Sequence, residues 1–142
     1  MKRVVIIIVI LIIASANTCK RFNGWDSRLV ISNQSSQPIY YAIGNAYPDT
    51  LIPGYPPLPN PTLSPSAHKV LPFSTHGIAL NGSWESFYSN IKPSDKLIFF
   101  VFNANTLETK NWDTVRAGYM ILKRYELTLD SIKKMNWVIT YP

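Results

Sequence analysis

Cys19 is the residue of this sequence with the most distinctive chemistry, because it is the only cysteine in the 142 residues. A single thiol cannot form an internal disulfide, and in an oxidising compartment an unpaired thiol is open to oxidation. Two interpretations remain: the thiol is acylated, or the cysteine is incidental to a processed segment. The stretch "ASANTCKR" at 14–21, which surrounds it, bears on this choice.

The segment before Cys19 has the order of a secretory signal. Lys2 and Arg3 are followed by an uninterrupted apolar run at 4–13 and then by small and polar residues. A membrane-spanning helix needs about 20 apolar residues, so this run is too short to be one. We therefore predict a lipoprotein-type signal peptide at 1–18, a tether at 19–27 and one β-rich domain at 28–142.

Two cleavage sites are compatible with this signal. Ala14 and Ala16 form a small-x-small pair, and a cut after Ala16 would release a soluble secreted domain that begins at Asn17. The alternative is a lipobox that ends at Cys19, although Ala16 and Thr18 depart from the residues usual three and one before the cysteine. We favour lipidation, because it gives the lone thiol a use and several acyl chains together anchor firmly.

Aromatic side chains are the candidates for contact with a ligand. Tyr47, Tyr55, Trp84 and Trp112 lie near expected loops, where an amphipathic ring could stack on a sugar or fill a protein groove. The alternative is that each ring plugs the core. We expect a concave aromatic patch beside the proline-rich segment at 47–65 if the binding interpretation holds.

Catalytic and cofactor motifs are not recognisable. His68 and His76 are eight positions apart on loop-like sequence, which matches no usual metal-ligand spacing. No serine lies in a G-x-S-x-G motif, and no glycine-rich phosphate loop is present. We therefore predict no catalytic residue, no metal ligand and no cofactor. A small hydrolase with an unrecognised site remains an alternative, because sequence cannot show which distant acids meet in space.

The net charge of +6 does not point to nucleic acid. After the signal segment the cations are spread along the chain, with adjacent basic pairs only at 20–21, 123–124 and 133–134. A nucleic-acid binder concentrates its cations on one face, because phosphate contacts supply much of its affinity. We interpret the charge as a mildly basic solvated surface.

The elements that must position these residues are mostly strands. β-rich runs occupy 28–32, 38–44, 69–73, 76–80, 96–103, 118–127 and 136–142. The first two are separated by a polar turn and are expected to pair as a hairpin. The continuous apolar run at 97–102 predicts a central strand that is covered on both faces.

Short helices and one irregular segment complete the expected fold. Helices are predicted at 84–90, 111–118 and 128–136, capped by Ser83, Asn111 and Thr128, with Asn136 taking a left-handed exit. The prolines at 47–65 predict an extended loop. The sum is a mainly β fold, a small antiparallel β-sandwich of six or seven strands with two or three short helical connections after the signal segment.

The carboxyl-terminal stretch carries a family resemblance. "WDTVRAGYMILKRYELTLDSIKKMNWVITYP", at 112–142, resembles small uncharacterised lipoproteins of gut Bacteroidota that share W-x-x-(I/V)-R, I-L-K-R-Y-(D/E)-L-(S/T) and N-W-x-I-x-Y-P. The resemblance implies lipidation at Cys19 and no assigned activity. Relatives tend to carry Asp where this chain has Asn103 and Asn105.

Together these features predict an uncharacterised cell-envelope lipoprotein that acts as a non-catalytic binding or structural accessory module. Its expected partners are the membrane, through lipid on Cys19, and an envelope protein or a glycan. Surface export in this bacterial group is often associated with acidic residues after the cysteine, whereas this chain has Lys20 and Arg21. We therefore favour a lipid-anchored location that faces the periplasm over one at the cell surface.

Overall fold

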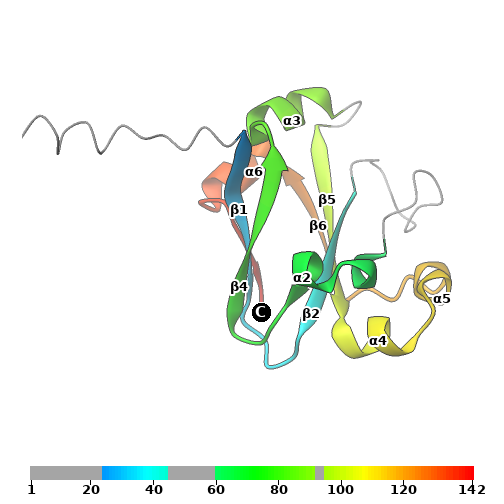
Figure 1. Ribbon diagram of the computed structural model, residues 1–142. Helices are drawn as coiled ribbons and strands as arrows, with labels where there is room; N and C mark the ends of the chain where they lie inside the picture. The colour runs from blue at the N-terminus through cyan, green and yellow to red at the C-terminus, as the bar shows by residue number, and fades with distance from the viewer. Residues whose placement is uncertain (1–23, 45–59, 92–94) are drawn as a thin grey trace, which may run out of the picture.

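Seven strands form two sheets in the computed structural model, which describes residues 24–44, 60–91 and 95–142 (Figure 1). The strands are β1 (Trp25–Asn33), β2 (Ile39–Gly44), β3 (Lys69–Val70), β4 (Ser74–Asn81), β5 (Lys96–Asn103), β6 (Lys123–Thr128) and β7 (Val138–Tyr141). Sheet A has the order β4-β1-β7, and sheet B has the order β3-β2-β5-β6. Of the described residues, 43% are in strands and 32% in helices, so the prediction of a mainly β sandwich is confirmed.

Neighbouring strands run antiparallel except at one edge, where β1 and β7 are parallel with Val30 opposite Val138. The predicted hairpin between the first two strands is wrong. β1 pairs with β4 and β7, whereas β2 pairs with β3 and β5, so the connection between them crosses from one sheet to the other. The buried side chain of Asn33 holds this corner, because it donates to the carbonyls of Gln37 and Leu71 and accepts from the Ser35 N–H.

The helices are short and most have a side-chain cap. They are η1 (Pro61–Leu63, a 3-10 helix), α2 (Pro65–His68), α3 (Trp84–Asn90), α4 (Ala104–Thr109), α5 (Trp112–Ala117) and α6 (Leu129–Lys134). The predicted caps are confirmed: Ser83, Asn111 and Thr128 each accept from a backbone N–H in the first turn. Asn136 has the predicted left-handed backbone, with φ of 51°.

Three sequence-based boundaries need correction. The first strand begins at Trp25, so residues 25–27 belong to the domain and not to the tether. Residues 118–122 do not extend β6. Instead residues 118–120 close the end of α5, where the Met120 N–H donates to the Val115 carbonyl and Tyr119 takes a left-handed φ of 48°. Residues 121–122 lead into β6, and the Leu122 N–H donates to the Val101 carbonyl of β5. The predicted strand at 69–73 is likewise shortened to the two residues of β3.

The proline-rich segment is described only from residue 60 onward. There the prediction of an extended loop is wrong, because the chain forms η1 and the start of α2. Pro61 and Pro65 each stand at the beginning of a helix, where the missing N–H breaks no helical hydrogen bond. The rest of the segment lies outside the described residues.

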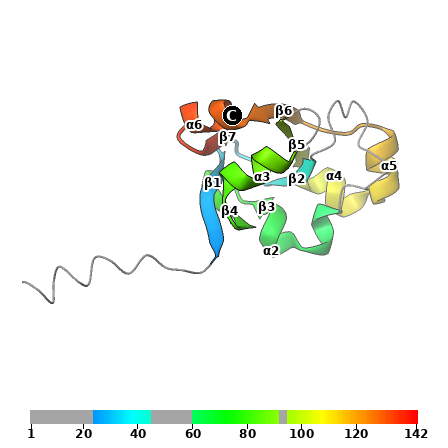
Figure 2. The same cartoon turned by 90° about the horizontal axis from the view of Figure 1, so that it is seen from above.

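β5 separates two cores, as its apolar run predicts. Alternate side chains enter the inner core between the sheets, whose buried members include Leu29, Ile31, Ile39, Tyr41, Leu97, Phe99, Val101 and Ile139. The others enter the outer core under α4 and α5, whose buried members are Tyr40, Ala42, Ile98, Phe100, Phe102, Ala104, Leu107 and Val115. Figure 2 shows α3 lying over the space between the sheets, with α4 and α5 beyond sheet B.

Candidate functional site

A cleft of about 390 Å³, here called the edge cleft, lies where β4 of sheet A faces β2 of sheet B and the helix α2. Its lining consists of Tyr41, Ile43, Ala67, His68, His76, Gly77, Ile78 and Ala79. Tyr41 has ring contacts with both imidazoles, with centroid separations of 5.2 Å to His68 and 5.8 Å to His76. The fold therefore brings two histidines to one aromatic ring, which the sequence spacing did not predict.

The polar groups of the edge cleft are held in defined states. The Tyr41 hydroxyl donates to the Ala67 carbonyl at 2.6 Å, and burial raises the pKa of Tyr41 to about 12. His68 Nδ1 lies 3.1 Å from the Tyr41 carbonyl, which can only accept, so Nδ1 carries the proton. Burial lowers the pKa of His68, which keeps its ring neutral at neutral pH and leaves Nε2 as an acceptor.

The Tyr41 hydroxyl and the lining of the edge cleft differ in the chemistry that they offer. Tyr41 cannot act as a base or acid near neutral pH, because its pKa is high and its proton is committed to Ala67. A mostly apolar lining with few polar groups, here the imidazoles of His68 and His76, is typical of a site that orients a hydroxyl or amide of a small ligand. The Phe73 turn, whose φ is 51°, reverses the chain and places His76 opposite His68. No spacing rule in the sequence could have signalled that reversal.

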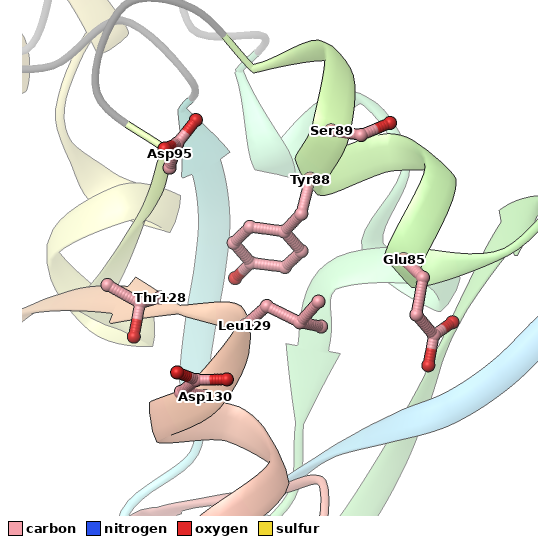
Figure 3. A pocket seen from close by; sticks show the side chains of 7 residues that line it. All are labelled: Glu85, Tyr88, Ser89, Asp95, Thr128, Leu129 and Asp130. Carbon is pink, nitrogen blue, oxygen red and sulfur yellow. The ribbon is translucent and has the colours of Figure 1, made fainter.

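A second cleft, here called the acidic cleft, lies at the end of the sandwich near α3 (Figure 3). It has a volume of about 550 Å³ and is lined by Glu85, Tyr88, Ser89, Asp95, Thr128, Leu129 and Asp130. In Figure 3 the Tyr88 ring extends from α3 toward Thr128 and Leu129. Tyr88 is only 3% exposed and donates to the Leu127 carbonyl at 3.0 Å, so its ring forms a wall and offers no open face.

Arg28 controls the electrostatics beside the acidic cleft. Its Nη1 donates to Glu85 at 3.0 Å and its Nε donates to Asp26 at 2.9 Å. Hydrogen bonding to Arg28 lowers the pKa of Glu85, and it is also the main cause that lowers the pKa of Asp26 to about 2. Both carboxylates are therefore ionised at neutral pH and already partnered, which reduces their availability for an incoming cation.

The predicted site residues do not gather in one place. Cys19, Tyr47 and Tyr55 lie outside the described residues. Trp84 is 2% exposed and packs in the inner core against Phe87, so in this structure it offers no ring face to a ligand. Trp112 is half-buried beside the outer core, edge-on to Phe102 at 5.7 Å. The two described candidates thus stand on opposite sides of sheet B.

Within 24–44, 60–91 and 95–142, no group of three or more His, Cys, Asp and Glu side chains could hold a metal ion. In the same ranges no helix is both long and apolar enough to cross a bilayer.

Comparison with known proteins returns no match to this chain, whether with protein-family models, with curated proteins or with solved structures.

Proposed function

We propose that this chain is a cell-envelope lipoprotein, anchored through acyl chains on Cys19, whose domain is a non-catalytic binding or structural accessory module. One observation carries the proposal: the only cysteine ends a signal-like segment and stands six positions before Trp25, where the folded domain begins. A cut before Cys19 would remove the apolar run and leave every described element in the mature chain. Lys20 and Arg21 favour a domain that faces the periplasm.

The edge cleft supports the binding part of this proposal. It combines a mostly apolar lining, backed by the buried Tyr41 ring, with the neutral imidazole of His68, whose tautomer is fixed by a backbone carbonyl. Such a site recognises a ligand by shape and one or two hydrogen bonds, as expected for a glycan or for a side chain of an envelope protein. The spread of basic residues gives no support to a nucleic-acid partner.

The anchoring is tested by the intact mass of the mature protein from its native membrane fraction, beside a Cys19→Ala variant. We expect a chain that begins at Cys19 and carries acyl mass, and we expect that form to be lost in the variant. A bare chain that begins at Asn17 in both proteins would contradict the proposal and establish the secreted soluble alternative.

The binding role is tested by removing the polar group of the edge cleft. His68 lines the cleft, and its Nδ1 is held by the Tyr41 carbonyl. Wild-type protein would be screened against envelope glycans and peptides, and each ligand found would be tested with His68→Leu. The control is Leu63→Ala, at an exposed residue outside the cleft lining. We expect His68→Leu to lose binding while Leu63→Ala keeps it. Ligands that bind both variants as tightly as wild type would show that the edge cleft is not the site.

A further inference from the structure

Trp25 differs from the other tryptophans in its surroundings. Trp84 is 2% exposed in the inner core, Trp112 packs against Phe102 beside the outer core, and Trp137 lies under the Arg28 guanidinium at 4.1 Å. Trp25, by contrast, is 62% exposed although it is the first residue of β1. The Trp25 ring is therefore available to a partner outside the domain, and a tryptophan ring offers a large apolar contact area with one polar N–H.

The chain before Trp25 limits how far that partner can be. The Gly82 N–H donates to the Gly24 carbonyl, which fixes Gly24 to the end of sheet A. From Cys19 to Gly24 there are five residue steps, which reach about 18 Å at full extension. If Cys19 carries acyl chains, its backbone lies at the membrane surface. The Trp25 end of β1 is then held within one short tether length of the lipid headgroups.

The residues around Trp25 are chemically suited to contact with lipid headgroups. Tryptophan favours the membrane–water interface, because its ring is apolar and its indole N–H can still bond to headgroups or water. Lys20 and Arg21 in the tether favour anionic headgroups. The nearest acids on the strand and on α3, Asp26 and Glu85, are both paired with Arg28, which reduces their repulsion from an anionic surface.

We propose that the Trp25 end of the sandwich docks on the phospholipid bilayer, with the Trp25 ring in the headgroup layer. The inference rests on the proposed lipid anchor at Cys19. It gives the domain an orientation: β1 rises from the membrane, and the corner at Asn33 is at the far end of the same strand. Exposed Phe73, which precedes the Ser74 partner of Asn33, is then presented away from the bilayer.

The test couples the protein to lipid chemically, so that it does not depend on acylation in the cell. The chain from Cys19 onward, which includes every strand of both sheets, would be attached through its single thiol to maleimide phospholipid. The vesicles would contain phosphatidylethanolamine and phosphatidylglycerol, with or without lipids brominated near the headgroup. Tryptophan emission would be compared between wild type, Trp25→Phe and the matched control Trp112→Phe.

We expect brominated lipid to quench part of the wild-type emission, and we expect that quenchable part to be lost in Trp25→Phe and retained in Trp112→Phe. Insertion of a long Gly/Ser segment after Arg21 should weaken the quenching, because it lowers the effective concentration of Trp25 at the surface. Equal quenching in wild type and Trp25→Phe, or no quenching in either, would overturn the docking. Neither result bears on the anchor itself, which the intact mass decides separately.

Discussion

The two faces of β5 are buried by different kinds of structure. Phe99 faces sheet A in the inner core, whose strands come from segments as distant as β1 and β7. Phe100 faces the outer core, which is covered by α4 and α5, the two helices that follow β5 directly in the chain. One core is therefore closed by long-range strand pairing and the other by a local helical cover.

This difference predicts that substitutions in the inner core destabilise the fold more than equivalent substitutions in the outer core. Removing a contact from the inner core opens space between two sheets that cannot move independently, because hydrogen bonds such as that from Tyr125 to the Thr140 carbonyl join them. The outer cover consists of two six-residue helices that can shift or open while the sheets stay paired.

The comparison between the two cores is tested most strongly by alanine substitution of Phe99 in the inner core and Phe100 in the outer core. Phe99 and Phe100 are both 0% exposed, and loss of a buried phenylalanine side chain costs about 3–5 kcal/mol. We expect Phe99→Ala to lower the free energy of unfolding more than Phe100→Ala, because Phe99 stacks on Tyr41 at 5.1 Å in the less adaptable layer. Urea denaturation measures both values. An equal or greater loss for Phe100→Ala would contradict the comparison.

Asn33 tests the corner that joins the two sheets. Its side chain is 0% exposed and bonds the carbonyls of Gln37 and Leu71. We expect Asn33→Ala to lower the free energy of unfolding by about 2–3 kcal/mol, because it leaves buried carbonyls without donors. Asn33→Asp should be at least as damaging, since it places a carboxylate against those carbonyls. Thermal unfolding of both variants checks this, and a change near zero would show that the corner is held by packing alone.

Stability at low pH tests the inner-core side of the comparison, because Asp26 joins sheet A to α3 beside the inner core. Its Oδ2 accepts from the Trp84 N–H at 3.1 Å, and hydrogen bonding to Arg28 lowers its pKa to about 2. A lowered folded-state pKa adds stability above the unfolded-state pKa of about 4, and that stability is lost as the pH falls from about 4 toward 2. We expect Asp26→Asn to be less stable at neutral pH and to flatten this slope. The free energy of unfolding would be measured from neutral pH downward. The control is Asp113→Asn, because the Asp113 side chain is 85% exposed. If the pH dependence of Asp26→Asn is as steep as that of wild type, the Asp26–Arg28 pair does not stabilise the fold.

The smallest expected effect concerns the outer cover alone. The Asn111 side chain accepts from the Asp113 N–H at 2.8 Å and caps α5. Its replacement by alanine should cost about 1 kcal/mol and should speed hydrogen exchange of the α5 amides. Amides of β5 should exchange as in wild type. Faster exchange in β5 as well would mean that the two layers open together.

Local features of the fold could be predicted from the sequence, and long-range ones could not. Ser83, Asn111 and Thr128 were recognisable as caps because each bond is made within three residues. The burial of β5 followed from its own apolar run. The first two strands, however, were expected to pair because they are adjacent in sequence.

The same distinction explains what was missed. The Asn33 side chain donates to the Leu71 carbonyl, 38 positions away, at the corner where the chain passes to the second sheet. The helix α4 was not predicted, because it follows β5 without a loop and its only cap, Asn103, is also the last residue of that strand. The edge cleft depends on the reversal at Phe73, which brings His68 and His76 to Tyr41. A left-handed phenylalanine has no sequence signature.

The parallel pairing of β1 with β7 has a kinetic consequence. Val30 and Val138 must meet across nearly the whole domain, and closing so long a loop is slow, because its entropy is lost before the contact is gained. Sheet B and its helical cover can form from closer segments, between β2 and β6. We expect refolding to begin in sheet B and to end when β7 joins sheet A, so that hydrogen-exchange protection of the Ile139 amide is acquired last.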